Sequence, residues 1–345
     1  MSVFSAILGQ EAAVEWLRGA MAAGRVPHAM LFAGPAGVGK GTTAALLAKW
    51  WLCEAPTGDD VCGKCAACRL VDAGAHPDLH RVYKELIRFH DKTGKSKGTV
   101  LAINVIREEL IHVAMRKASM GRGKAFIVEE AERMSDEAQN ACLKTLEEPY
   151  GRTIIVLLTD SPGLLLPTIR SRCQMVRFGP LPEDLVAKEL AGRGIEAAAA
   201  ASAARLSQGS LGVALRWLKD GVAARAAELE GRVRRLLGGD PRALEDLPEW
   251  MKTAAEEFAA AALERDELAS KEQATREAIG LYLRLLSEWL RTAMVQADDP
   301  NRLLDLADAV EGIVRTEQYL DANVSIALLL RQLAGTLNRR LIGPE

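Results

Sequence analysis

A glycine-rich stretch at residues 33–42 constrains the fold of this chain more than any other feature. It reads AGPAGVGKGT and lies between an apolar run at 30–33 and a helical pattern at 42–52. In that context the pattern G-x-x-x-x-G-K-[ST] forms a loop whose backbone N–H groups bind phosphate oxygens. Gly34, Gly39 and Lys40 match the pattern, and Gly37 adds a further glycine to the loop. The stretch predicts the fold of a nucleotide-binding domain; a glycine-rich turn without a ligand is the alternative.

The same loop departs from the pattern at one position. Gly41 stands directly after the lysine, where a Ser or Thr hydroxyl would ligate the magnesium ion that bridges the nucleotide phosphates. Thr42 comes one residue late, about 100° further round the helix, so it does not simply replace the missing ligand. The loss predicts weakened binding of magnesium-nucleotide and argues against hydrolysis.

A second departure follows the apolar run at 125–128. An ATPase of this type places Asp at the end of such a strand to hold magnesium, and Glu after it to activate the attacking water. Here Glu129 has one methylene more than Asp, while Glu130 occupies the position of the base. Taken alone, the pair is more simply interpreted as the solvated, acidic start of a helix. Together with Gly41 it favours lost catalysis.

Four cysteines follow the helix after the loop. They have the spacing C-x8-C-x2-C-x2-C at Cys53, Cys62, Cys65 and Cys68. Four thiolates this close suit a tetrahedral zinc site with no open position for catalysis. An iron–sulfur cluster and four free thiols are the alternatives. A further cysteine, Cys142, lies on an apolar helical face and is expected to be a small buried hydrophobe.

Apolar runs alternate with helical patterns over roughly the first 180 residues, which predicts a parallel sheet covered by helices on both faces. The expected strands are residues 30–33, 79–83, 125–128 and 154–158, and an amphipathic helix is expected at 105–115. The segments 178–182 and 238–241, rich in Gly and Pro, break the pattern. We therefore expect three domains, namely an α/β domain at 1–180 with the four-cysteine module at 53–75, a small helical domain at 181–238 and an all-α domain at 239–345.

Composition excludes some classes of function. A formal net charge of −2 argues against a protein that coats nucleic acid through bulk electrostatics. No run of about 18 apolar residues predicts a membrane span, and charged residues at 11–18 interrupt any signal peptide. Six cysteines without a secretory signal predict a cytoplasmic protein. Lys92, Lys95 and Lys97 lie in a basic stretch at 81–124, which predicts a solubilising surface or, alternatively, contacts to a phosphate backbone.

One arginine stands between short side chains, in the triplet Ser171, Arg172 and Cys173. Its position just before a further strand, expected without set bounds, suits a side chain that projects outward. A surface salt bridge is the alternative interpretation of Arg172, and Cys173 is expected to be buried like Cys142.

Three motifs together resemble the AAA+ subunits of the bacterial DNA polymerase III clamp loader. These are Gly-Pro-x-Gly-x-Gly-Lys in the loop, LKTLEEP at 143–149 and Ser-Arg-Cys at 171–173. The four-cysteine insert is shared by the delta-prime and gamma/tau subunits of that family. The resemblance covers roughly the first 210 residues with specific motifs; beyond them, only helical character and length support it.

The resemblance implies an α/β nucleotide-binding domain with a zinc insert, a helical lid and a C-terminal helical collar. Such subunits form a five-membered ring with gamma/tau and delta subunits, which opens a sliding clamp and places it on primed DNA. Arg172 is implied to be an arginine finger that reaches the ATP site of the adjacent subunit. Thr159 matches the position that senses the γ-phosphate in active members. Gly212 stands where those members have an arginine that contacts the nucleotide.

The losses at Gly41, Glu129 and Gly212 resemble delta-prime rather than gamma/tau. The interpretation is a non-hydrolysing or weakly active clamp-loader subunit that lends Arg172 to its neighbour. Because Lys40 and the loop glycines are intact, residual binding of nucleotide stays open. Two alternatives stay open as well: an active gamma/tau-type ATPase that relies on Thr42 and Glu130, and a zinc-dependent binding module on a vestigial ATPase scaffold.

Overall fold

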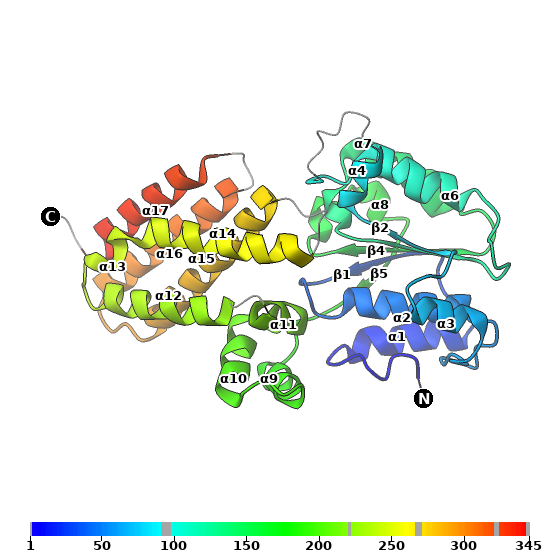
Figure 1. Cartoon of the computed structure of the whole chain (residues 1–345), viewed down its shortest axis with the longest axis horizontal. Helices are drawn as coiled ribbons and strands as arrows, with labels where there is room; N and C mark the ends of the chain where they lie inside the picture. The colour runs from blue at the N-terminus through cyan, green and yellow to red at the C-terminus, as the bar shows by residue number, and fades with distance from the viewer. Residues whose placement is uncertain (1, 91–97, 220–221, 266–270, 321–323, 343–345) are drawn as a thin grey trace. The chain divides into compact units, whose positions relative to one another are not determined.

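The computed structural model describes residues 2–90, 98–219, 222–265, 271–320 and 324–342 (Figure 1). It divides into two compact units, residues 1–215 and residues 216–345. The predicted division into three domains, at residues 180 and 238, is finer than this and stays a prediction. Among the helices that the structure describes, none is both long and apolar enough to cross a membrane.

The first unit is built on a parallel five-stranded sheet with the order β2-β3-β4-β1-β5. The strands are β1 (Ala29–Ala33), β2 (Leu79–Val82), β3 (Lys124–Val128), β4 (Thr153–Thr159) and β5 (Gln174–Arg177). All four strands that were expected are present, within two residues of the expected ends. The α/β fold predicted for the first part of the chain is thereby confirmed.

Helices cover both faces of the sheet (Figure 1). One face carries α1 (Glu11–Ala22) and α2 (Lys40–Leu52), with α3 (Ala66–Asp72) beside α2. The other carries the elements from η1 to α8, which are η1 (Lys84–Leu86), α4 (Ile87–His90), α5 (Ile103–Val105), η2 (Ile106–Ile111), α6 (His112–Ala114), η3 (Ala131–Arg133), α7 (Asp136–Glu147), η4 (Pro162–Leu164) and α8 (Pro167–Arg170). The amphipathic helix expected at 105–115 is thus present, with π-type turns in its middle.

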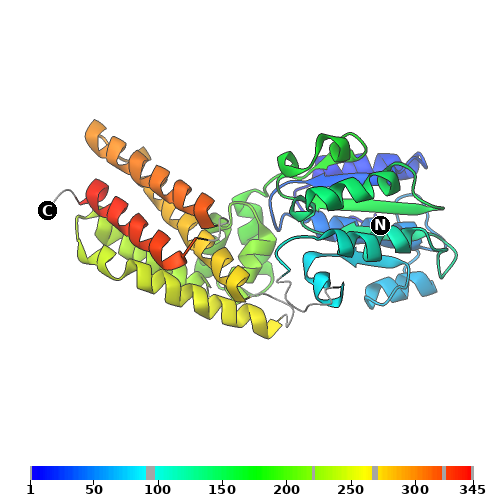
Figure 2. The same ribbon diagram turned by 90° about the horizontal axis from the view of Figure 1, so that it is seen from above.

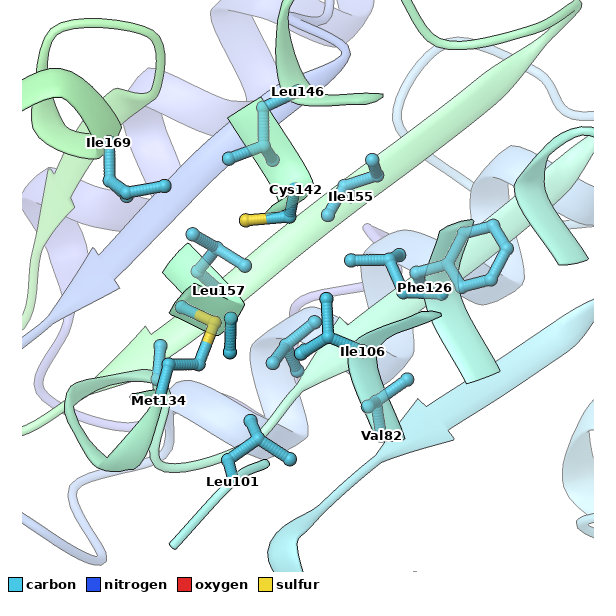
Figure 3. Packing of buried hydrophobic residues seen from close by; sticks show 14 of the residues in the cluster. Val82, Leu101, Ile106, Phe126, Met134, Cys142, Leu146, Ile155, Leu157 and Ile169 are labelled. Carbon is cyan, nitrogen blue, oxygen red and sulfur yellow. The ribbon is translucent and has the colours of Figure 1, made fainter. Parts of the chain in front are cut away.

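Alternation along the strands explains the three layers. In β1, Leu31 contributes to the core under α7 and η2, whereas Met30 and Phe32 contribute to the core under α1 and α2. In β4, Ile155 and Leu157 face the first of these cores (Figure 3), while their neighbours face the second. Successive side chains of a strand point to opposite faces, so a strand buried on both must be apolar throughout. This is why the inner strands β1, β3 and β4 stand out in the sequence as apolar runs, unlike the edge strands β2 and β5, which are only partly buried.

Three helices follow the sheet, α9 (Glu183–Gly192), α10 (Ala197–Leu206) and α11 (Leu211–Lys219). The part of them that belongs to the first unit, residues 181–215, is called the lid segment below. Pro182, Glu196 and Ser210 stand directly before the three helices. The side chains of Glu196 and Ser210 accept backbone N–H bonds in the first turns of α10 and α11, which satisfies donors that have no partner inside a helix.

The second unit is entirely helical in the residues described (Figure 2). Its helices are α12 (Val222–Leu237), α13 (Arg242–Glu245), α14 (Leu247–Arg265), α15 (Lys271–Val295), α16 (Pro300–Leu320) and α17 (Ile326–Leu341). Consecutive long helices pack on one another, and the middle helix α15 supplies the largest buried group, including Tyr282, Leu283 and Leu286. This helical C-terminal half agrees with the expected all-α region.

Candidate functional site

The glycine loop joins β1 to α2 at the carboxyl ends of the strands. Gly37 and Gly39 have φ angles of 70° and 108°, a left-handed conformation that favours glycine. Lys40 is buried, and its Nζ donates to Gly34 O (2.6 Å), to Pro35 O (2.7 Å) and to Asp160 Oδ1 (2.7 Å). An ammonium group has three protons to donate. The lysine expected to bind phosphate is therefore fully engaged within its own loop and by Asp160.

The position of the missing hydroxyl is not crowded. A Cβ on Gly41 would have Leu158 Cδ1 as its nearest neighbour, at an ordinary 3.7 Å. Thr42 is exposed, and the next residue, Thr43, is buried with its Oγ1 donating to Gly39 O at 2.9 Å. The fold thus leaves room for a Ser or Thr side chain at position 41, and the magnesium ligand is absent only because the residue there is glycine.

Both acids at the end of β3 are paired with bases, one in β2 and one directly after it. Glu129 forms an ion pair with Arg81 (2.7 Å), and Glu130 forms one with Lys84 (2.6 Å). The side chain of Lys84 is only 6% exposed. Glu130 has a φ of 46°, which a non-glycine residue rarely adopts. The groups expected to handle magnesium and water are therefore each paired with a base of the same chain, although Glu129 and Glu130 stay partly exposed.

The polar residue at the end of β4 also has an internal role. Thr159 is buried; its Oγ1 accepts from Ser161 N at 3.1 Å, and its carbonyl accepts from Gly34 N at 3.1 Å. Asp160, which follows it, holds Lys40. The turn after β4 is thereby tied to the glycine loop.

The lid segment makes backbone contact with the glycine loop. Gly212 N donates to Gly37 O at 2.9 Å. A Cβ on Gly212 would stand 2.9 Å from Gly37 Cα and 3.0 Å from Gly37 O. A Cβ on Gly37 would stand 2.3 Å from Ser210 Oγ. This close approach requires glycine on both sides.

The four cysteines come together at the other end of the sheet. The sulfur atoms of Cys53, Cys62, Cys65 and Cys68 all lie within 4.8 Å of one another. A tetrahedral zinc ion with Zn–S bonds of about 2.3 Å would space its sulfurs about 3.8 Å apart, and Cys62 and Cys68 are separated by 4.0 Å. Backbone N–H groups of Cys62, Cys65 and Cys68 donate to the sulfurs of Cys53, Cys62 and Cys65.

The pKa values of these thiols fit a metal site. Backbone N–H groups of Lys64 and Cys65 lower the pKa of Cys62 to about 6, so its thiolate forms readily. Burial raises the pKa of Cys53 and of Cys68. Buried thiolates need a nearby cation, and a metal ion among the four sulfurs would supply it. The residues therefore suit a metal such as zinc in a structural role.

Arginines tie this module to the sheet. Arg152, just before β4, lies with its guanidinium 4.0 Å from the ring centre of Trp51 and donates to Trp51 O at 2.7 Å. It also donates to Arg122 O, while Arg122 donates to Glu54 O at 3.2 Å. Because these arginines precede β3 and β4, the module lies at the amino ends of the strands.

Arg172 lies at the same amino edge, between α8 and β5. Its Nε donates to Glu147 Oε2 at 3.0 Å and its Nη1 to Thr168 O at 3.2 Å. The side chain of Arg172 is 33% exposed and that of Glu147 is 58% exposed. The arginine expected to project outward is therefore partly exposed and held by an ion pair at the surface.

Several residues of this arrangement were not expected from the sequence. They are Arg81, Lys84, Glu147, Asp160 and Ser210. Charged residues at the carboxyl ends of expected strands could have pointed to the first two and to Asp160. The expected burial of Cys142 and Cys173 is confirmed, and burial raises the pKa of each to about 12. Lys92, Lys95 and Lys97 lie outside the described residues.

Comparison with known families settles the class of protein. The family model described as DNA polymerase III, delta subunit, matches residues 9–182, just over half of the chain. The chain belongs to this family.

Curated relatives agree with the match. Over 213 residues the chain is 35% identical to DNA polymerase III subunit delta' of Pseudomonas aeruginosa, covering 61% of each protein. Over 194 residues it is 37% identical to subunit delta' of Escherichia coli, covering 56% of the chain and 55% of the relative. Subunit tau of Escherichia coli is 33% identical over 187 residues, 54% of the chain and 27% of tau. The match thus spans about 55–61% of the length of these delta' relatives, and the predicted resemblance to delta-prime is confirmed.

Solved structures give more distant likenesses. A DNA polymerase III gamma subunit-related protein of Thermotoga maritima aligns over 94% of the chain and 98% of its own, with 18% identity and a TM-score of 0.42. A mutant of Thermotoga maritima RuvB aligns over 99% of the chain and 89% of its own, with 17% identity and a TM-score of 0.43.

Proposed function

We propose that this chain is a clamp-loader subunit that does not hydrolyse ATP, or does so only weakly, and that lends Arg172 to the ATP site of an adjacent subunit. Its partners would be the gamma/tau and delta subunits of a five-membered ring, which loads a sliding clamp onto primed DNA. In this proposal the zinc module has a structural role.

One observation carries the first half of the proposal: the charged groups of the chain's own site are paired with one another. Lys40 is held by Asp160 and two loop carbonyls, Glu129 by Arg81 and Glu130 by Lys84. Catalysis of phosphoryl transfer depends on such groups being placed on phosphate, magnesium and water. Binding of magnesium-nucleotide would have to break these pairs. It would also lack the magnesium ligand that a hydroxyl at position 41 would supply.

The lid segment supports the same half. In an active subunit an arginine in this segment would contact the nucleotide, whereas here the backbone of Gly212 occupies the space directly beside Gly37. A nucleotide in the loop would compete with this contact. The intact lysine and glycines stay compatible with weak binding of nucleotide to which magnesium contributes little.

The second half is supported by the position of Arg172. Its partner Glu147 is more than half exposed, and exposed ion pairs contribute only about 0–1 kcal/mol. A phosphate group of a neighbouring subunit could therefore engage the arginine at little cost. An arginine supplied in trans in this way is worth roughly 10³ to 10⁵ in rate at the site that it serves.

The test uses the reconstituted complex with Arg172→Ala. The expected result is normal assembly with a lower kcat for ATP at the site next to this chain, and no ATPase activity of this chain alone. Arg170→Ala is the matched control, because Arg170 is an exposed arginine two residues before Arg172, at the end of α8. An Arg172→Ala complex that hydrolyses ATP at the wild-type rate would refute the proposal that Arg172 acts at the ATP site of the adjacent subunit. Appreciable DNA-stimulated turnover by this chain alone would instead favour the active gamma/tau-type alternative.

A further inference from the structure

The ion pair between Arg172 and Glu147 leaves part of the guanidinium group available. A guanidinium has five N–H donors. Nε donates a hydrogen bond to Glu147 Oε2, and Nη1 donates one to the carbonyl oxygen of Thr168. Within the described residues Nη2 has no hydrogen-bond partner. The inner part of the group is thus fixed by the protein, and one terminal nitrogen is left for a ligand.

Glu147 is carried by a rigid element. It is the last residue of α7, whose residues Cys142 and Leu146 are fully buried in the core. The carbonyl of Leu146 accepts a hydrogen bond from His28 Nε2 at 2.9 Å, which ties the end of α7 to the residue before β1. A group on such a helix end can orient its partner more precisely than a group on a loop can.

Stability gives a poor explanation for this glutamate. The C-terminal end of a helix carries a partial negative charge, which disfavours an anion there. The exposed pair with Arg172 contributes little to stability. The consequence of the contact that matters here is therefore the orientation of Arg172.

We propose that Glu147 is a positioning residue for Arg172: it grips the Nε side of the guanidinium so that Nη2 is presented to a phosphate oxygen of the nucleotide bound by the adjacent subunit. This inference rests on the proposed role of Arg172 as a finger. Glu147 itself touches no nucleotide in this account. It acts on the rate only through the arginine.

The test is a double-mutant cycle in the reconstituted complex, with Glu147→Ala, Arg172→Ala and the two changes combined. Displacing a catalytic group by about 1 Å can cost up to about 10²-fold in rate, and we expect Glu147→Ala to lower kcat about tenfold with KM for ATP unchanged. The combined variant should be no slower than Arg172→Ala, because Glu147 acts only through that arginine. Glu147→Gln should retain most of the rate, since its side-chain oxygen still accepts from Nε. Glu148→Ala, at the exposed neighbouring position, is the matched control and should behave like the wild type.

The possible results separate the positioning role of Glu147 from the role of Arg172 as a finger. If Arg172→Ala itself has the wild-type rate, the finger is refuted and Glu147 has nothing to position. If Arg172→Ala is slow but Glu147→Ala is as fast as the wild type or faster, the finger stands and the positioning role is refuted. A combined variant slower than Arg172→Ala would show that Glu147 acts through the general structure, which also overturns the inference. Glu147→Gln keeps the test valid if Glu147→Ala fails to assemble.

Discussion

The two edges of the parallel sheet differ in how deeply their basic side chains are buried. At the carboxyl edge, Lys40 and Lys84 are almost fully buried, and each donates to an acid of the same site. At the amino edge, Arg172 is one-third exposed and keeps one guanidinium nitrogen without a hydrogen-bond partner among the described residues. Both edges carry residues of a type used in phosphoryl transfer. What differs is the burial of the basic side chain: Lys40 and Lys84 are 7% and 6% exposed, whereas Arg172 is 33% exposed.

This difference indicates how a nucleotide-binding fold can keep its shape without its ligand. A buried ammonium group needs acceptors, and in the glycine loop the carbonyls of Gly34 and Pro35 together with Asp160 supply them. The contact between Gly212 and Gly37 closes the same loop from the lid segment. The loop is in this sense complete by itself, whereas at the amino edge the four cysteines could hold a metal ion and, in our proposal, Arg172 would meet a phosphate of a partner.

Removal of the metal should have the largest effect, and it tests the amino edge. Metal binding to a structural zinc site is worth about 10–16 kcal/mol and is coupled to folding. A chelator, or Cys62→Ser combined with Cys65→Ser, should therefore unfold residues 53–75 locally while the sheet stays folded. Hydrogen exchange of the backbone amides measures both regions at once.

Cys142→Ala is the matched control, because this buried cysteine is not part of the cluster. It should leave the metal content and the exchange of residues 53–75 unchanged. Protection of that segment that survives complete removal of the metal would contradict a structural metal. If the backbone amides of the whole sheet also lost protection from hydrogen exchange, the four-cysteine module would stabilise more than the amino edge.

A methyl group at the lid contact should have the next largest effect, and it tests the closure of the carboxyl edge. Gly212→Ala places a Cβ 2.9 Å from Gly37 Cα, and overpacking of this kind costs about 1–3 kcal/mol. Urea denaturation should show the loss. Gly19→Ala is the control: this glycine lies inside α1 with open space around it, and the change should stabilise the protein by about 0.5–1 kcal/mol. An equally harmless Gly212→Ala would mean that the lid segment does not hold the loop closed.

Repair of the magnesium site should have the smallest effect. Gly41→Thr combined with Glu129→Asp restores two residues of an active site, and position 41 has room for the side chain. We nevertheless expect no measurable ATP turnover by the chain alone, because Lys40, Glu130 and the lid contact keep their internal partners. Thr42→Ala is a useful companion, since a drop in nucleotide affinity would show that Thr42 replaces the missing hydroxyl. Turnover in the repaired chain would mean that the pairs at the carboxyl edge are easily opened.

The sequence predicted the parts of this molecule that depend on neighbouring residues. Strands such as 125–128 and 154–158 were visible because both of their faces are buried, and the four cysteines were visible because their spacing matches a metal site. The long-range contacts at the two edges of the sheet could not be predicted from the sequence. Lys40 with Asp160, Gly37 with Gly212 and Arg172 with Glu147 join residues far apart in the chain, and only the folded sheet brings them together.

The unexpected details have the same origin. The π-type turns at 106–111 and the left-handed backbone of Glu130 are conformations that a sequence pattern rarely predicts, because few residues adopt them. Gly212 was expected to be a lost contact to nucleotide. The structure adds that its missing side chain is what lets the lid segment reach the loop.

The most direct test of the central claim compares Lys40→Ala with Arg172→Ala in the reconstituted complex, with assembly verified for both. If this chain contributes to catalysis only through its neighbour, Lys40→Ala should leave the ATPase rate of the complex unchanged, and Arg172→Ala should lower it. The opposite pattern, a slow complex with Lys40→Ala and a wild-type rate with Arg172→Ala, would contradict the account.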